Sequence, residues 1–183
     1  MNKENINEAI NEALAKATTK PLKIKNRYLR ELGNWLVGMS LAGNDSRQRT
    51  RFIELIYPRI KEIEEELKAV DKEIKDKAKK DGKGELVRLN ERQKVGADGK
   101  VVMDKDGKPV MEWDLDISPE DLQKINDDLE KYMDEEFVID VLDSNKEKVR
   151  IVKQIILNTD HKFTGRDAII YNQWCEAFEA VEI

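Results

Sequence analysis

Cysteine and histidine are almost missing from this chain of 183 residues, which has one of each, Cys175 and His161. A single cysteine cannot form an internal disulfide, and a single histidine leaves any His-based metal site, catalytic triad or general-base pair incomplete within the chain. The N-terminal sequence also lacks the apolar run and the small-residue cleavage site of a signal peptide. We therefore expect an intracellular protein with no catalytic residue, no metal and no cofactor.

Long hydrophobic runs are also missing. No stretch approaches the ~20 consecutive apolar residues that a membrane helix requires, so we expect no membrane partner. Aromatic residues make up only 6% of the chain, whereas charged residues make up 39%. Apolar positions must therefore form narrow stripes rather than a broad aromatic core, and this favours long amphipathic helices.

Three features that could carry chemistry have simpler structural explanations. Cys175 follows Trp174 in a helical pattern with a strong apolar stripe, where a buried cysteine acts as a small hydrophobe. His161 is expected in an exposed loop. The glycines between residues 82 and 107 precede strands and turns rather than helix N-termini, so nucleotide hydrolysis is disfavoured.

The strongest pattern in the chain is an apolar seam with alternating spacings of three and four. It consists of Ile53, Ile56, Ile60, Ile63, Leu67, Val70 and Ile74. This seam predicts a helix over residues 53–80 that needs a partner helix, and Pro58 should either kink that helix or begin it.

The partner helix is predicted over residues 118–134. Its start signal is an N-cap serine, a first-turn proline and first-turn acids, and its seam contains Leu122, Ile125 and Leu129. Two complementary seams predict a long antiparallel helical hairpin, in which Ile60, Ile63, Leu67 and Val70 face the second seam. The same seam offers a route to an oligomer.

The segments around this hairpin complete an α+β, mainly α, fold. Residues 85–117 have strand character with turn signals at Asp98-Gly99 and Asp106-Gly107, which predicts a small β-meander inserted at the hairpin tip. A short helix over 6–17, a strand over 22–25 and a helix over 28–39 precede the hairpin. A buried strand over 136–141 and two helices, opened by Ser144 and Thr164, follow it. We expect one domain spanning residues 1–183, without an internal repeat.

Charge is distributed unevenly along the chain. Residues 20–51 contain eight basic and two acidic residues, whereas residues 112–140 contain twelve acidic residues and two lysines. The favoured interpretation is that these regions face each other or are simply solvated. The alternatives are a phosphate-binding arm at the basic end, or an acidic surface that docks on a basic partner.

The acidic region supplies the candidate partner-binding residues. Glu112, Asp114 and Asp116 alternate with apolar residues, so in a strand they share one face and could hold a divalent cation. Cross-strand ion pairs with Arg88, Arg92 and Lys94 explain the same row without a metal and are favoured. On the following helix, Asp127, Asp128 and Glu130 are predicted on one exposed turn, which completes the candidate set.

Several segments together give the chain a family resemblance. They are Lys23-Ile24-Lys25-Asn26-Arg27-Tyr28, the charged helix over 60–80, the Asp-Gly-Lys hairpin, Glu135-Glu136-Phe137-Val138-Ile139-Asp140-Val141 and Phe163-Thr164-Gly165-Arg166-Asp167. In this order the chain resembles small proteins encoded by tailed bacteriophages that carry a long charged helical hairpin. The resemblance implies no catalytic residue. It implies a setting in the cytoplasm of an infected bacterium, or in the virion.

Two main hypotheses of function follow. In the first, the protein is not an enzyme and binds a host or phage protein, which it modulates or inhibits. In the second, it is a structural component or helper of virion assembly. A third hypothesis, nucleic-acid binding through the basic face, is disfavoured because Tyr28 and Trp35, which could stack on bases, both lie on an apolar helical stripe.

Overall fold

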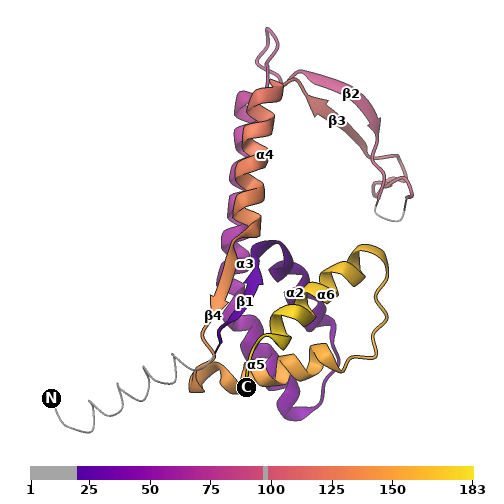
Figure 1. Cartoon of the computed structure of the whole chain (residues 1–183). Helices are drawn as coiled ribbons and strands as arrows, with labels where there is room; N and C mark the ends of the chain where they lie inside the picture. The colour runs from indigo at the N-terminus through magenta and orange to yellow at the C-terminus, as the bar shows by residue number, and fades with distance from the viewer. Residues whose placement is uncertain (1–19, 97–98) are drawn as a thin grey trace, which may run out of the picture. The chain divides into compact units, whose positions relative to one another are not determined.

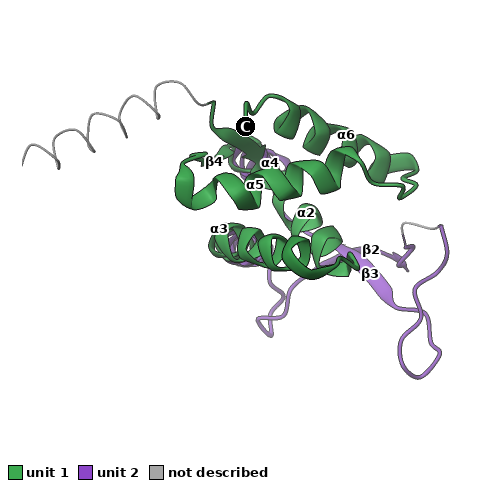
Figure 2. Cartoon of the chain, turned by 90° about the horizontal axis from the view of Figure 1, so that it is seen from below, with its two compact units in different colours: residues 1–64, 131–183 green, residues 65–130 purple. Residues whose placement is uncertain are grey.

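The computed structural model describes residues 20–96 and 99–183, which divide into two compact units (Figure 2). Unit 1 comprises Met1–Glu64 and Lys131–Ile183, and unit 2 comprises Glu65–Glu130. Helices predominate, and the strands form two small antiparallel sheets (Figure 1), which confirms the predicted α+β, mainly α, class.

Two of the sequence-based expectations concern a short helix near the N-terminus and the absence of a membrane-spanning helix. The helix predicted over 6–17 lies outside the described residues. Within the described part of the chain, no helix combines the length and the apolar character needed to cross a membrane.

A two-stranded sheet connects the two chain segments of unit 1. β1 (Leu22–Lys25) pairs antiparallel with β4 (Glu136–Ile139). Alternation along β1 buries Leu22 and Ile24, the period-two pattern that predicts this strand. In β4, Ile139 is buried but Val138 is 48% exposed, so the prediction of a buried strand is wrong for one of its faces.

The core of unit 1 is built by α2 (Asn26–Gly38), α5 (Asp143–Leu157), α6 (Gly165–Glu179) and the first part of α3 (Gly43–Lys77). Each helix contributes an apolar stripe at three- and four-residue spacing. The completely buried side chains in these helices are Leu29, Leu32, Leu36, Phe52, Ile56, Val149, Val152, Ile156 and Phe178. The helices expected over 28–39, from Ser144 and from Thr164 are therefore present.

The start of α3 differs from the prediction. α3 begins at Gly43, well before the predicted start at residue 53, and Pro58 lies inside the helix, which is one of the two predicted alternatives. Arg49 lies in this additional first part of α3, and its guanidinium donates to the carbonyl oxygens of Leu36 (3.0 Å) and Met39, so it caps the end of α2. No local sequence signal reveals this cap.

A close approach and a buried amide fix the packing of α2. A Cβ atom at Gly33 would lie 3.0 Å from Cδ1 of Ile60, so only glycine lets the helices meet without displacement. Asn26 is 1% exposed; its Nδ2 donates to the carbonyl of Tyr132 (2.7 Å) and its Oδ1 accepts from Nε of Arg59 (3.0 Å). Both polar ends of this buried side chain are therefore satisfied.

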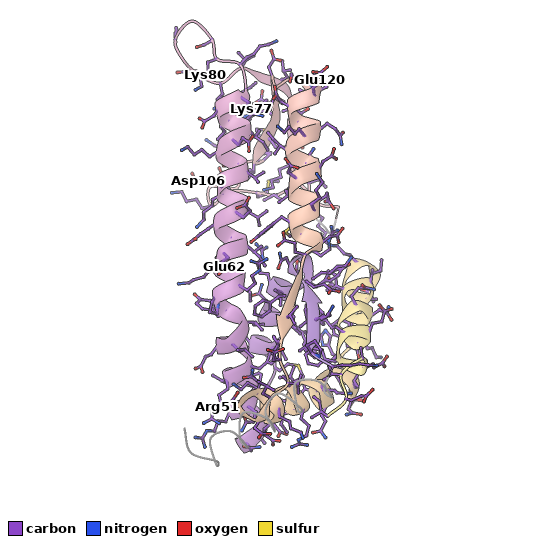
Figure 3. The ribbon with its side chains drawn as sticks, turned by 60° about the vertical axis from the view of Figure 1, so that its left-hand side comes forward. Arg51, Glu62, Lys77, Lys80, Asp106 and Glu120 are labelled. Carbon is purple, nitrogen blue, oxygen red and sulfur yellow. The ribbon has the colours of Figure 1, made fainter. Side chains whose placement is uncertain are left out.

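Unit 2 contains the end of α3 and the start of α4 (Pro119–Asp134), which run antiparallel side by side (Figures 1 and 3). Ser118 accepts a hydrogen bond from the amide of Asp121 at 3.1 Å, which confirms the predicted N-cap. Lys77 of α3 forms an ion pair with Asp121 at 3.0 Å, and Figure 3 shows Lys77 and Glu120 at the same end of the two helices.

The seam between these helices is only partly enclosed. Ile125 is 4% exposed, but Leu122 on the preceding turn is 36% exposed. Leu67, Val70 and Leu129 are half-buried. The two helices of the predicted hairpin are therefore present, and in unit 2 their seam is buried completely at Ile125 but only partly elsewhere.

The β element of unit 2 consists of β2 (Arg88–Gln93) and β3 (Met111–Leu115), paired antiparallel. A β-bulge interrupts the pairing between Leu89 and Arg92, where Asn90 adopts a φ of 50°. The middle segment of the predicted meander forms isolated bridges, from Val101 to Val95 and from Met103 to Pro109, rather than a strand. The first and last strands of the predicted meander therefore form, but they pair directly with each other, and the meander order is wrong because the middle strand is absent.

Two rings of backbone hydrogen bonds hold together the chain segments of the β element, where the middle strand of the predicted meander does not form. In each ring three residues from separate segments exchange backbone hydrogen bonds cyclically, with donor–acceptor distances of 2.7–3.2 Å in the first and 2.8–2.9 Å in the second. The first ring joins Lys79, Val87 and Asp116, and the second joins Lys94, Val102 and Val110. Each ring uses both the N–H and the C=O of its members.

Three tight turns connect the segments of these rings and share one hydrogen-bond pattern. In each, the first residue donates its N–H at 2.8 Å to the carbonyl four positions on, as from Asp81 to Glu85, Gly96 to Lys100 and Asp104 to Lys108. The fourth residue is a glycine with φ between 74° and 81°, a region that glycine adopts without strain. Two of these turns contain the predicted turn signals Asp98-Gly99 and Asp106-Gly107, and the turn from Asp81 to Glu85 shares their hydrogen-bond pattern.

Candidate protein-binding surface

The acidic row on β3 is bound by basic side chains of unit 2. Nε of Arg92 donates to Glu112 at 2.8 Å, and its NH1 donates to Asp114 at 3.0 Å. Hydrogen bonds from Asn90 and then Arg92 hold the pKa of the Asp114 carboxyl below its usual range. Lys79 forms an ion pair with Asp116 at 3.0 Å.

These contacts agree only in part with the predicted cation partners. Arg92 pairs as expected, but Arg88 lies over the ring of Trp113, 3.8 Å from its centroid, on the opposite face of the strands. Among the described residues, no group of three or more histidine, cysteine or acidic side chains is arranged to hold a metal ion. The acidic row therefore acts as one half of a cross-strand ion-pair network.

The other candidate carboxylates lie on α4 and face water. Asp127, Asp128 and Glu130 are all exposed, as their predicted position on an outer turn requires. Asp127 accepts a hydrogen bond from Gln123 at 2.7 Å within the same helix. The candidate set thus divides into Glu112, Asp114 and Asp116, which pair with Arg92 and Lys79, and an exposed group on α4.

Part of the acidic region and part of the basic region neutralise each other, as the favoured interpretation of the charge pattern expects. Lys23 pairs with Glu136 and Lys25 pairs with Asp134, each at 2.9 Å, because β1 and β4 are neighbours. Hydrogen bonding from Lys25 also lowers the pKa of Asp134. The basic segment consequently offers less charge to an anionic partner than its composition suggests.

The two residues singled out for reactive chemistry have ordinary surroundings. His161 is exposed, as predicted, and its ring lies 4.6 Å from that of Phe163. Cys175 is half-buried, so the expectation of a buried thiol is wrong; it lies one turn after Tyr171 on α6. Burial first, and a hydrogen bond with Cys175 second, raise the pKa of Tyr171 to about 12.

Large apolar side chains are exposed at five positions of unit 2, which sequence reasoning missed. In the described part of this unit only Ala78 and Ile125 are buried hydrophobic residues. The exposed ones are Leu89 (42%), Val95 (55%), Met103 (57%), Met111 (39%) and Leu122 (36%). We call these five residues the apolar surface of unit 2. Leu89, Val95, Met103 and Met111 lie in segments whose pattern predicts strands, and Leu122 lies on α4, so the sequence alone does not show that these side chains remain exposed.

The chain was compared with known proteins. No protein-family model, curated protein or solved structure matches it.

Proposed function

We propose that this protein acts by binding another protein through unit 2 and has no catalytic activity of its own. The observation that carries the proposal is the apolar surface of unit 2. Three of its residues, Val95, Met103 and Met111, each follow one member of the ring formed by Lys94, Val102 and Val110, and large apolar side chains exposed close together are typical of a protein-interaction site. Flexible methionines such as Met103 and Met111 adapt their shape to a partner at low cost.

The exposed carboxylates of α4 favour a partner with basic character. Asp127, Asp128 and Glu130 contribute three negative charges over little more than one helical turn. Such charges attract a basic surface and repel nucleic acid, and their long-range effect decreases as the Debye length shortens from ~10 Å at 0.1 M salt to ~3 Å at 1 M. We therefore favour a basic protein over nucleic acid as the partner.

The setting of the proposal comes from the resemblance to tailed-phage proteins. In the cytoplasm of an infected bacterium, the partner would be a host or phage protein that this chain modulates or inhibits. The second candidate is a role in virion assembly, in which the apolar surface of unit 2 would contact a further copy of the chain or a structural protein. Self-association of the pure protein would distinguish the second candidate from the first.

The first test compares the apolar surface of unit 2 with exposed apolar residues elsewhere. In the test variant Val95, Met103 and Met111 are changed together to serine. In the control Val37 and Ile169, which are 64% and 66% exposed in unit 1, are changed to serine. Each immobilised protein is incubated with a lysate of bacteria, and the retained proteins are quantified by mass spectrometry. We expect a protein retained by the wild type and the control to be lost at least about tenfold from the unit 2 variant, equivalent to ~1.4 kcal/mol.

Equal retention by all three proteins would refute binding through unit 2. Sedimentation velocity on the same set supplies the second reading. Concentration-dependent dimerisation that disappears only in the unit 2 variant would favour the assembly role over an adaptor role.

The second test reverses charge on each side. Asp127, Asp128 and Glu130 are changed to lysine in one variant. In the matched control Arg30, Arg47 and Arg51, which are also exposed, are changed to glutamate. The acidic variant should lose the retained partner and the salt dependence of its binding. If only the arginine variant loses binding, the basic face carries the function and nucleic acid becomes the leading partner.

A further inference from the structure

A cluster of aromatic rings lies in unit 1. Trp35 of α2 lies 5.8 Å from Phe163 and 5.7 Å from Trp174 of α6, measured between ring centroids. Phe163 also stacks on Tyr171 at 4.2 Å and 11°. In a chain with so few aromatic residues, this gathering is a distinctive local feature.

The cluster lines a pocket of about 240 Å³, which also receives two carboxylates. Glu31 lies one turn before Trp35 on α2, and Asp167 lies two turns before Trp174 on α6, so each acid shares a helix face with an aromatic wall. Neither acid forms an ion pair with a described residue. The pocket, which His161 also lines, therefore combines aromatic walls with two carboxylates that form no ion pair with a described residue.

This combination is suited to an organic cation. The face of an aromatic ring carries negative potential and attracts a cation within ~6 Å of its centroid, and nearby carboxylates add to that attraction. The volume is below the ~300–1,000 Å³ of pockets that enclose drug-sized ligands. The pocket thus fits a single side chain better than a cofactor.

Unit 2 shows how this chain arranges such a contact internally. The guanidinium of Arg88 lies 3.8 Å above the ring of Trp113. In the described part of the chain, no cation covers Trp35, Phe163 or Trp174 in this way. Trp174 is buried, and Phe163 is stacked on Tyr171, so Trp35 and the remaining face of Phe163 are the aromatic surfaces left for a cation.

We propose that this pocket binds an arginine side chain of a partner protein, with the guanidinium against Trp35 and Phe163 and its N–H groups directed at Glu31 and Asp167. Arginine suits the site better than lysine because its planar guanidinium stacks on aromatic rings and donates to two carboxylates at once. The site belongs to unit 1 and stands whether or not unit 2 binds a protein.

The test uses N-acetyl-arginine amide as the probe and the indole N–H signals of the full-length protein in ¹H–¹⁵N NMR spectra. The chain has three tryptophans, and Trp113 serves as an internal control because Arg88 already covers its ring. Saturable shifts of Trp35 and Trp174, with Trp113 unchanged, support the proposal. N-acetyl-citrulline amide, which keeps the shape but lacks the charge, should leave all three signals in place.

A pair of charge variants tests the carboxylates without removing an aromatic side chain. Glu31→Gln with Asp167→Asn should weaken arginine binding about five- to tenfold, as expected for two partly exposed charge contacts. The matched control is Glu54→Gln with Asp143→Asn, which line a different hollow in unit 1 and change the net charge equally. The control should bind the probe like the wild type.

Four outcomes would overturn the proposal. They are no shift of Trp35 and Trp174 with the arginine probe, equal shifts with citrulline, equal weakening by both charge variants, and tighter binding of N-acetyl-lysine amide or tetramethylammonium than of the arginine probe. The last result would assign the pocket to an ammonium group instead of a guanidinium.

Discussion

Replacing Ile125 by alanine should loosen unit 2 while leaving unit 1 intact. Ile125 is 4% exposed and, with Ala78, supplies the buried hydrophobic residues in the described part of this unit. The substitution removes three carbon groups at ~0.8 kcal/mol each, or roughly 2.4 kcal/mol, and a residual cavity adds to this loss. Because every 1.4 kcal/mol corresponds to a factor of ten, local opening of unit 2 should become roughly 50-fold more frequent.

Leu122 provides the matched comparison because it lies one turn earlier on α4 and is 36% exposed. Its replacement by alanine should cost roughly 1–1.5 kcal/mol, since part of the side chain already contacts water. Native-state hydrogen exchange of the α4 amides measures both changes, and the fluorescence of Trp113 reports on the β element. Amides of α5, such as that of Val152, should exchange as in the wild type.

Two results would refute this reasoning. Equal effects of the two substitutions would show that burial along the seam does not govern the stability of unit 2. Parallel loss of protection in α5 would show that the two units open as one cooperative body.

Three further outcomes are expected in unit 1. Gly33→Val should destabilise the fold by ~1–3 kcal/mol in thermal unfolding because the added methyl groups meet Ile60. Gly33→Ala should remain within ~1 kcal/mol of the wild type, because its higher helix propensity offsets the closer contact with Ile60. Asn26→Ala should cost ~1–3 kcal/mol in urea unfolding because it removes a buried hydrogen bond to the carbonyl of Tyr132 and the acceptor of Nε of Arg59. In a spectrophotometric titration, one phenol should ionise near pH 12, and this ionisation step should be missing in Tyr171→Phe. Because the pKa of Tyr171 is raised in the folded state, its contribution to stability is complete below pH ~10 and is lost as the pH rises through about 12.

Much of the fold could be predicted because its signals are local. The seam of α3, the Ser118 cap of α4 and the alternation in β1 each involve residues that are close in sequence. Periodicity and capping act within one or two turns, so they can be read without knowledge of the tertiary structure.

The features that escaped prediction depend on distant contacts. Arg49 caps α2 from another helix, and Lys79 reaches Asp116 only because a hydrogen-bonded ring brings their segments together. The same holds for the candidate sites. The aromatic pocket unites Trp35 with Phe163, which are far apart in sequence, and the exposure of Met103 follows from a strand that did not form.

The two hydrogen-bonded rings restrict how a partner can be recognised. A peptide that joins a sheet by strand addition needs free N–H and C=O groups along an open edge. At Lys79, Val87 and Asp116, and again at Lys94, Val102 and Val110, both groups are already used within the ring. At these six positions a partner can therefore read side chains but cannot extend the backbone pairing, and the tip can present apolar residues without templating strand-to-strand aggregation there.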